Sequence, residues 1–379
     1  MKFPIRVLQL NYGSSGAIGG VSTLTLRWYQ FIDKSKIKFT FLSRGGTFEI
    51  FRNEIEGYGD KIVTLGATGC GIPAHIRYIY KLYKHIKDNP YDIVHISSGS
   101  QGFNFVSLLV CKMAGVKIRI VHSRNTRANP KKTVFRKIFL KQLTERLATH
   151  FFSISKKASI FMFSKRLISS GKVQIIKNGI NTEEFVYNEV KREQVRLDLE
   201  LGEDFVIGHI GRFVEQKNHI FLLEIFREVL SLHPCSTLLL IGEGGLETAI
   251  KEQAKRLGIL EKIKFLGIRK DVPALLSAMD VFVFPSLFEG FGNVGLEAQA
   301  AGLPTIMSDV IPDEISVTDE AIFLSLDQSA KEWAKTILAY TDYKRRDQRQ
   351  RIIEAGYEMK EVAKQLENDY LSFYNKIYQ

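Results

Sequence analysis

Two glutamates eight residues apart stand in the segment 285–304, which follows an apolar run and opens a helical pattern near Asn293. Glu289 lies in the loop, and Glu297 lies about one turn into the predicted helix. Carboxylates that point into a cleft suit the hydroxyl groups of a sugar or ribose, because each accepts two or more hydrogen bonds. The amides of residues 290–295 could bind a phosphate oxygen. Judged by their spacing alone, two such carboxylates more often have a structural role, because negative charge near a helix N-terminus interacts favourably with the helix dipole.

A pair of cations follows another predicted strand. Arg212 and Lys217 stand five residues apart after the apolar run 205–210, and a helix is expected from about Lys217. Two cations at the carboxyl end of a strand can converge on one polyanionic group such as a diphosphate. On spacing alone, a surface salt-bridge pair is the more common outcome. A glycine-containing loop at residues 242–245 likewise lies between a predicted strand and a helix.

The first half of the chain offers a glycine-rich loop and a histidine, each after a strand. Gly19 and Gly20 belong to the stretch 11–22, where backbone amides could approach an anion. Its spacing is neither GxGxxG nor a P-loop, so no dinucleotide or nucleoside-triphosphate fingerprint follows, and a flexible loop is an even alternative. His122 ends the apolar run 118–122. A lone histidine is more often structural than catalytic, but a strand end is a favourable position for chemistry.

Short apolar runs rich in β-branched residues alternate with helical segments, the pattern of βαβ units and parallel sheets. The polar stretch 181–204 lacks a strand signal and is expected to be a linker. Residues 358–379 show helical spacing of apolar residues and are expected to form an amphipathic helix. The pattern therefore predicts two doubly wound α/β domains, at 1–180 and 205–357, with a ligand cleft at the carboxyl ends of their strands. The predicted strands are 5–10, 38–42, 61–65, 93–96, 118–122, 151–154, 173–176, 205–210, 237–241, 263–266, 281–284 and 305–307.

The length of 379 residues suits two domains, and the charge is divided unequally between them. The first 177 residues carry 30 Lys and Arg against 8 Asp and Glu, a formal charge of +22. The remaining residues carry a formal charge of −10, which gives the net charge of +12. An anionic partner of the first half, nucleic acid or a lipid surface, is one interpretation, and an ordinary solvated surface is the other.

Cysteine usage and hydropathy limit the setting of the protein. Cys70, Cys111 and Cys235 are far apart and form no CxxC pair, so a reduced cytoplasmic setting without a zinc site is expected. The N-terminus lacks the features of a signal peptide, and no run approaches 18 apolar residues. Any membrane contact is therefore expected to be peripheral.

A basic segment stands out between Arg119 and Arg146, which has nine Lys and Arg opposed only by Glu145. Apolar residues recur within it at helical spacing. A basic amphipathic helix on an anionic membrane is one interpretation, with about 1 kcal/mol of attraction per cation near the surface. The alternative is a sheet-covering helix whose apolar stripe packs inward, and both can hold at once. The apolar residues are Val134, Phe135, Ile138, Phe139, Leu143 and Leu147.

Taken together, these motifs resemble the retaining family 4 glycosyltransferases of the GT-B fold, particularly the bacterial enzymes of exopolysaccharide, capsule and O-antigen assembly. The resemblance covers nearly the whole chain and is strongest over residues 175–180, 208–213 and 285–304. The E-x7-E spacing of Glu289 and Glu297 is the most characteristic signature of that family. Close relatives often have a histidine at the position of Arg124, which here serves either the acceptor phosphate or the basic surface.

The resemblance implies two Rossmann-like domains facing across a cleft, the first binding the acceptor and the second the nucleotide sugar, with the C-terminal helix crossing back to the first. Arg212 and Lys217 would hold the donor diphosphate and stabilise the departing nucleotide. Glu289 would contact the transferred sugar and Glu297 the donor ribose, while His122 would approach the reacting sugar. The implied catalytic residues are Glu289, His122, Arg212 and Lys217. The implied donor-binding residues are Gly19, Gly20, Arg212, Lys217, Arg269, Glu289, Gly292, Asn293, Val294 and Glu297.

The function that the resemblance implies is transfer of a hexose or N-acetylhexosamine from a nucleotide sugar, with UDP favoured, to a polyprenyl-diphosphate-linked glycan, with retention of configuration. No metal or other cofactor is expected, because the cation pair supplies the positive charge at the leaving group. The expected place is the cytoplasmic face of the plasma membrane. A nucleic-acid-binding protein is the alternative from another class, although the sequence has no known reader motif. A catalytically inactive glycan- or lipid-binding scaffold is disfavoured, because all four charged residues of the implied site are present. They are Arg212, Lys217, Glu289 and Glu297.

Overall fold

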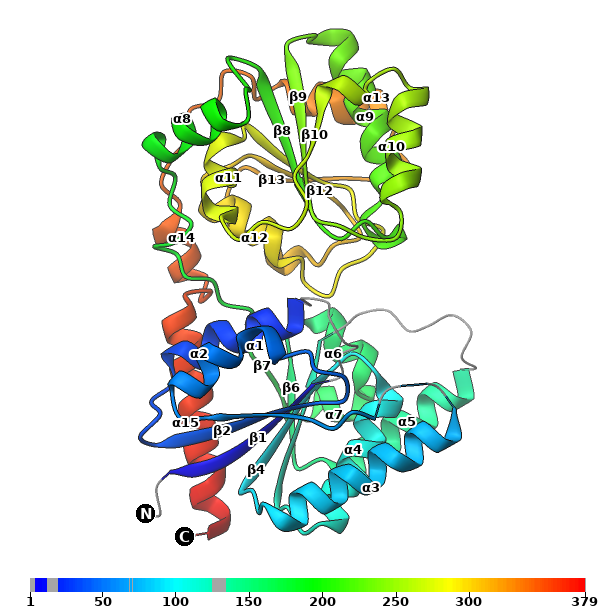
Figure 1. Cartoon of the computed structure of the whole chain (residues 1–379), viewed down its shortest axis with the longest axis vertical. Helices are drawn as coiled ribbons and strands as arrows, with labels where there is room; N and C mark the ends of the chain where they lie inside the picture. Colours follow the sequence, from blue (N-terminus) through cyan, green and yellow to red (C-terminus); the bar gives the residue numbers. More distant parts are fainter. Residues whose placement is uncertain (1–3, 12–19, 68, 70, 125–133, 379) are drawn as a thin grey trace. The chain divides into compact units, whose positions relative to one another are not determined.

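The computed structural model describes residues 4–11, 20–67, 69, 71–124 and 134–378, without the side chains of residues 20, 21 and 134–137. The chain divides into two compact units, shown in Figure 1. Residues 1–179 and 359–379 form the N-terminal unit, and residues 180–358 form the C-terminal unit.

The described residues of the N-terminal unit form a seven-stranded parallel sheet in the order β3-β2-β1-β4-β5-β6-β7, as the alternating pattern predicted. Strands β4 and β5 pair along their whole length, from Ile93 opposite Ile118 to Ser98 opposite Ser123. Ser97 therefore stands opposite His122 near the carboxyl ends of the two strands. The strands are β1 (Ile5–Asn11), β2 (Ile37–Ser43), β3 (Lys61–Thr64), β4 (Ile93–Ser98), β5 (Ile118–Ser123), β6 (His150–Ser153) and β7 (Val173–Ile175).

Helices cover both faces of this sheet (Figure 1). Alternate strand residues point to opposite faces, so α1 and α15 pack over one set, whereas α3 and α4 pack over the other. Helix α4 contacts both α3 and α5, so these three form one layer. The helices are α1 (Gly20–Phe31), α2 (Arg52–Gly57), α3 (Ile72–Asp88), α4 (Gln101–Met113), α5 (Val134–Leu147), α6 (Lys156–Met162), α7 (Lys165–Ser169) and α15 (Met359–Tyr378).

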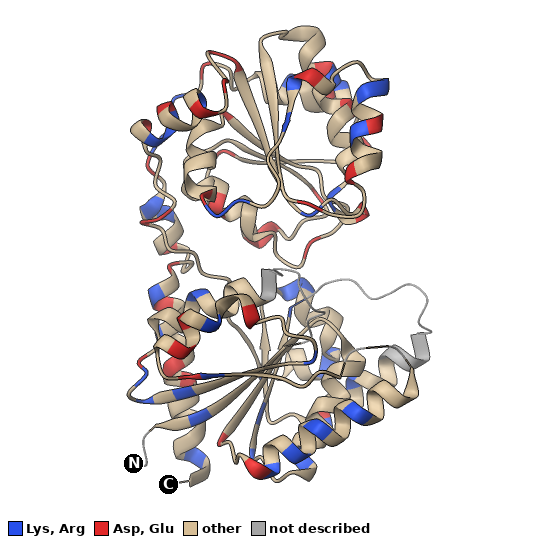
Figure 2. Ribbon diagram, viewed as in Figure 1, with Lys and Arg blue, Asp and Glu red and all other residues tan. Residues whose placement is uncertain are grey.

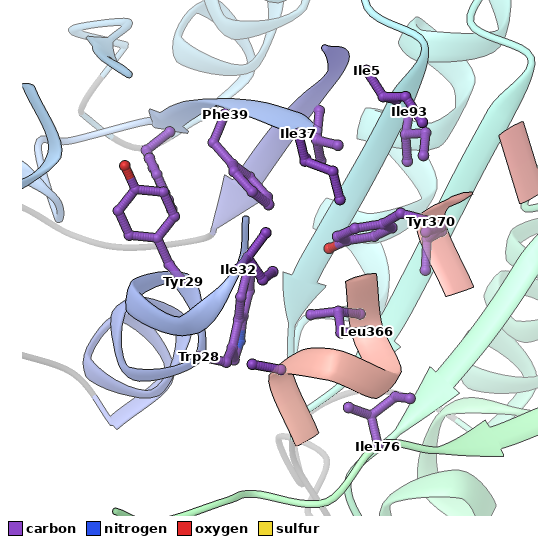
Figure 3. Packing of buried hydrophobic residues seen from close by; sticks show 14 of the residues in the cluster. Ile5, Trp28, Tyr29, Ile32, Ile37, Phe39, Ile93, Ile176, Leu366 and Tyr370 are labelled. Atoms are coloured by element: carbon purple, nitrogen blue, oxygen red, sulfur yellow. The ribbon is translucent and has the colours of Figure 1, made fainter. Parts of the chain in front are cut away.

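The C-terminal helix α15 belongs to the N-terminal unit and contributes to its core. Leu366 and Tyr370 are buried against residues of α1 and the sheet, as Figure 3 shows. Glu367, also buried, accepts hydrogen bonds from the Asp33 amide and the Lys36 ammonium, both at 3.0 Å. The helix is therefore held by an apolar stripe and by a carboxylate beside it.

The C-terminal unit has a six-stranded parallel sheet in the order β10-β9-β8-β11-β12-β13 over its described residues. Strand β13 was missing from the predicted set, because a run of four residues at a sheet edge gives too little periodicity to separate strand from helix. The strands are β8 (Phe205–Ile210), β9 (Ser236–Ile241), β10 (Ile263–Phe265), β11 (Val281–Phe284), β12 (Thr305–Ser308) and β13 (Ala321–Leu324). The helices are α8 (Glu189–Asp198), α9 (His219–Leu232), α10 (Glu247–Arg256), α11 (Val272–Ala278), α12 (Asn293–Ala300), α13 (Ala330–Leu338) and α14 (Arg349–Glu354).

The segment 181–204, expected as a linker, contains helix α8 and belongs to the C-terminal unit. Helix α8 packs on α11, and its Arg192 donates to Asp280 over 2.7 Å. Arg196 lies 3.4 Å from the other oxygen of Asp280, which also accepts from the Val206 amide at 2.7 Å. The charges that suggested a solvated connection therefore tie the helix to the start of β8.

Three loops at the carboxyl end of the C-terminal sheet lie against one another, and a glycine permits this contact. The Gly242 amide donates to Gly267 O over 2.8 Å, and the Phe213 amide donates to Glu243 O over 2.9 Å. Gly242 has φ of +135°, and a Cβ there would lie 2.1 Å from Gly211 O. The loop 242–245 thus supports the backbone on which Arg212 stands.

We expect Gly242→Ala to destabilise the C-terminal unit by at least about 2 kcal/mol, because overpacking and unfavourable backbone geometry each cost roughly 1–3 kcal/mol. In calorimetry of the full chain, this loss corresponds to a melting temperature lower by roughly 4–8 °C. Gly245→Ala is the matched control, since a Cβ at Gly245 meets nothing within 4 Å. Equal melting temperatures for the two variants would contradict the packing role of Gly242.

Candidate functional site

The loops after β8 and β11 bring a cation and a carboxylate together. Lys217 Nζ lies 2.8 Å from Glu289 Oε1, and their side chains are only 14% and 10% exposed. The ammonium also stands 4.6 Å from the centre of the Phe284 ring, within cation–π distance. The Leu287 amide donates to Gln216 O over 2.9 Å, which joins the two loops. Because β8 and β11 are neighbours in the sheet, residues 72 positions apart share one buried ion pair.

The other two predicted cations have different surroundings. Arg212 is exposed, and its side chain makes no hydrogen bond or ion pair to any described residue. Arg269 follows β10, two strands from β8 in the sheet, and donates to both carboxylate oxygens of Asp271 at 2.8 and 2.5 Å. The structure therefore places Arg212 on the loop that carries Lys217, and it pairs Arg269 locally with Asp271.

The segment around Gly292 turns the chain from β11 into α12. Gly292 has φ of +94°, and a Cβ there would lie 3.0 Å from Phe284 Cε1, so this position favours glycine on two grounds. Asn293 and Val294 are the first two residues of α12, as predicted. Glu297 is buried one turn later. The N-terminal end of α12, with its partial positive charge, thus follows the loop of Glu289 and suits an anion.

Two buried histidines beside Lys217 were missed by the sequence analysis. His209 Nδ1 lies 2.8 Å from Val283 O, which can only accept, so Nδ1 carries the proton. Burial, followed by the charge of Lys217, lowers the pKa of His219 to about 4. Burial and the neighbouring His219 also hold the pKa of His209 well below its usual range. Both rings are therefore neutral and leave Lys217 as the positive group there; their sequence context alone carried no sign of this.

In the N-terminal unit, His122 lies on β5 in contact with His95 of β4. The His95 Nε2 and His122 Nδ1 atoms are 3.1 Å apart, and the two ring planes are nearly parallel, with an interplanar angle of 10°. His95 Nδ1 lies 2.5 Å from the hydroxyl of Tyr370. Burial, followed by the charge of Arg124, holds the pKa of both histidines well below the usual range. His122 is therefore neutral and serves as a hydrogen-bonding group.

Arg124 is buried, so the interpretation that it only adds to the basic surface is wrong. Its Nη1 donates to Asn178 Oδ1 over 2.9 Å, and burial lowers its pKa to about 10. The other interpretation, contact with an acceptor phosphate, remains a prediction. Gly19 lies outside the described residues, and Gly20 is the first residue of α1.

The last part of the basic segment forms α5, but its apolar residues do not all pack inward. Leu147 is buried, whereas Ile138 and Phe139 are about half exposed. The expected inward stripe is therefore wrong at Ile138 and Phe139. No helix in the described part of the chain is long and apolar enough to cross a bilayer. Within that same part, no three His, Cys, Asp or Glu side chains form a metal-binding group.

Comparisons with known proteins agree on one family. Residues 18–184 match the model described as Glycosyltransferase Family 4, and residues 204–342 match Glycosyl transferases group 1. The EpsF protein of Bacillus subtilis strain 168, whose name assigns it to the glycosyltransferases, is 31% identical over 335 residues, 84% of either chain. A UDP-Gal:α-D-GlcNAc-diphosphoundecaprenol α-1,3-galactosyltransferase of Escherichia coli is 28% identical over 255 residues, 65% of either chain.

Among solved structures, Anabaena HepE in complex with UDP-glucose superposes with a TM-score of 0.76 at 18% identity, over 96% of this chain and 99% of HepE. This likeness concerns the fold. The two parallel-sheet units, the two family matches and the long alignment with EpsF together show that the chain belongs to glycosyltransferase family 4 and has the GT-B fold.

Proposed function

We propose that this glycosyltransferase moves a hexose or N-acetylhexosamine from a UDP-sugar to a polyprenyl-diphosphate-linked glycan during synthesis of a cell-surface polysaccharide. The observation that carries the proposal is the buried Lys217–Glu289 pair beside the N-terminal end of α12. A cation, a carboxylate and a helix N-terminus at one sheet edge suit a diphosphate joined to a polyhydroxylated ring. The E. coli relative is named for a UDP-sugar and a lipid diphosphate, which supports this donor and acceptor class.

In the proposed reaction, the bond between the anomeric carbon and the diphosphate oxygen breaks, and its electron pair stays on the diphosphate. A new bond forms between that carbon and an acceptor hydroxyl oxygen, whose proton leaves with the nucleoside diphosphate. Negative charge grows on the leaving oxygen, so the cations Arg212 and Lys217 are most stabilising in the transition state. We infer that these side chains do the work that a divalent ion does in other transferases.

We assign Glu289 to the hydroxyl groups of the transferred sugar and Glu297 to the donor ribose. The carboxylate of Glu289 is held by the ammonium of Lys217, which suits a hydrogen-bond acceptor of fixed position better than a nucleophile. Retention of the anomeric configuration is therefore proposed without a covalent intermediate on Glu289. His122, as a neutral imidazole, is assigned to a sugar oxygen, and the buried Arg124 to an acceptor phosphate.

We also propose that the helical layer α3–α5 binds an anionic membrane surface, where a lipid-linked acceptor would lie. One side of α3 is buried, yet its other side exposes Ile72, Ile76 and Tyr80 by 76%, 61% and 63%. Arg77 and Lys84 are exposed on the same helix. Figure 2 shows Lys and Arg recurring along the helices of this layer. Exposed apolar side chains among cations are typical of a helix that rests in a lipid interface.

The family assignment does not favour the alternative of a nucleic-acid-binding protein, although the basic charge of the first half is compatible with both. A lipid surface also explains the exposed isoleucines of α3, which counterion release at a phosphate backbone does not require.

Donor binding should depend on Arg212, whereas turnover should depend on both Arg212 and Glu289. We expect one UDP-sugar in a panel of UDP- and GDP-sugars to raise the melting temperature of the full chain. Arg212→Ala should weaken binding of that donor roughly 10- to 100-fold and should also lower kcat, because a charge-assisted contact to the diphosphate is lost in the ground state and in the transition state. Glu289→Gln should keep the thermal shift and lower kcat roughly 100- to 1,000-fold.

Arg227→Ala is the matched control for these variants, since Arg227 is an exposed cation of α9 paired with Glu228. NMR of the product gives the anomeric configuration. Unchanged turnover in Glu289→Gln, or a panel in which no nucleotide sugar stabilises the protein, would refute the assignment.

Chelation should leave transfer intact. Because Arg212 and Lys217 are proposed to supply the positive charge, initial rates with excess EDTA are expected to stay within about twofold of untreated enzyme. A loss that added Mg²⁺ or Mn²⁺ restores would overturn the proposed role of the cation pair.

Membrane binding should depend on α3 and on lipid charge. In flotation with phosphatidylglycerol-containing vesicles, we expect the full chain to bind, and Ile76→Glu/Tyr80→Glu to bind at least roughly tenfold more weakly, since two apolar side chains are lost from the interface. Leu197→Glu is the control, because Leu197 is similarly exposed on α8 of the other unit. Binding that is independent of lipid charge and unchanged by the α3 substitutions would contradict the membrane proposal.

A further inference from the structure

We propose that Tyr370, in the C-terminal helix, fixes the tautomer of His122 through His95, so that His122 presents an Nε2–H donor. The assignment of that donor to a sugar substrate rests on the proposed function, whereas the tautomer itself does not. Tyr370 is therefore a positioning residue, 275 positions beyond His95 in the chain.

Three buried rings form a continuous chain of hydrogen-bonding atoms. The Tyr370 hydroxyl lies 2.5 Å from His95 Nδ1, and His95 Nε2 lies 3.1 Å from His122 Nδ1. All three side chains are fully inaccessible to solvent. Figure 3 shows Tyr370 among the apolar side chains of its cluster, which offer no polar partner to hold a water in place of a missing ring.

The direction of the first hydrogen bond follows from the inventory of donors and acceptors. Among the described residues, His95 is the only hydrogen-bond partner of the Tyr370 hydroxyl. A phenol hydroxyl is a stronger hydrogen-bond donor than a neutral imidazole N–H, and an imidazole nitrogen is a stronger acceptor than a phenol oxygen, so a bond from Tyr370 to His95 is favoured over the reverse. Tyr370 therefore donates, and His95 Nδ1 accepts.

The direction of the second hydrogen bond follows from the first. A neutral imidazole whose Nδ1 accepts must carry its proton on Nε2. His95 Nε2 consequently donates to His122 Nδ1, and the proton of His122 is placed on its own Nε2. Ser97 Oγ also approaches His95 Nε2, but at 3.5 Å this contact is too long to reverse the order.

The last group in this chain of hydrogen bonds is the Nε2–H donor of His122. His122 Nε2 is buried and has no hydrogen-bond partner among the described residues. It lies at the carboxyl end of the N-terminal sheet, the edge where such sheets bind ligands. An N–H group at this place suits a hydroxyl, ether or phosphate oxygen and cannot act as a general base. We assign it to an oxygen of the bound substrate, a contact that requires the groups covering His122 Nε2 to move aside when substrate binds.

Packing keeps the rings from turning and so preserves the relay. The His95 ring is nearly parallel to those of Trp28 and His122, with interplanar angles of 13° and 10° and ring centroids 6.4 and 5.2 Å away. The edge of the Phe152 ring contacts both histidines. A flip of His95 would put carbon atoms in place of both nitrogens and break the contacts with Tyr370 and His122, so these contacts and the surrounding rings oppose it.

The test is ¹⁵N NMR of the full-length protein labelled at histidine, with the His122 signals identified by their loss in His122→Gln. Wild type is expected to show His122 protonated at Nε2 and unprotonated at Nδ1. Tyr370→Phe removes only the hydroxyl, and we expect His122 to become a mixture of both tautomers. His95→Leu, which removes the middle of the relay, should release the His122 tautomer in the same way.

Tyr374→Phe is the matched control, because Tyr374 is a buried tyrosine one turn later on the same helix. A His122 tautomer that is unchanged in Tyr370→Phe and in His95→Leu would overturn the proposal, as would wild-type His122 protonated at Nδ1. With an identified donor, Tyr370→Phe should lower kcat roughly fivefold to tenfold, as expected for one weakened hydrogen bond. If the tautomer responds but no sugar is transferred, the relay stands and the proposed function fails.

Discussion

The contact between Lys217 and Glu289 is the interaction on which the candidate site depends, and parallel strand pairing creates it. Strands β8 and β11 are neighbours although 70 residues of chain separate the end of one from the start of the other. Parallel neighbours end at the same edge, so the loops that follow them must meet. A cation and a carboxylate that share this buried edge compensate each other's desolvation, and this keeps both charges where a diphosphate and a sugar would need them.

In each unit, two buried histidines near a candidate cation are uncharged. His209 and His219 are neutral beside Lys217, and His95 and His122 are neutral beside Arg124, because burial and a nearby cation both disfavour a second positive charge. The result is one cation with a defined position and a set of rings that act through hydrogen-bond direction. In the N-terminal unit this direction is set from α15, so that helix contributes both apolar packing and the proton order of a candidate site residue.

The repeating pattern of apolar runs predicted the strands well, because a parallel sheet covered on both faces requires them to be apolar throughout. It failed where an element is held by something other than burial. Strand β13 is a half-buried edge, and α8 is a charged helix whose arginines are fixed by Asp280. Helix α3 shows the opposite limit. Its apolar residues extend from the buried side of Tyr78 and Leu82 to the exposed side of Ile76 and Tyr80, so periodicity alone does not separate the two sides.

By itself, the sequence determined the family, the fold class and the loops that carry Arg212, Lys217, Glu289 and Glu297, because these follow from local patterns and short motifs. Only the tertiary structure decided which of these residues meet. It paired Lys217 with Glu289, paired Arg269 with Asp271 and buried Arg124 against Asn178. It also joined Tyr370 to His95 and His122. The physical reason is that strand order and helix packing bring distant residues together, and neither can be inferred from the residue spacing within a single segment.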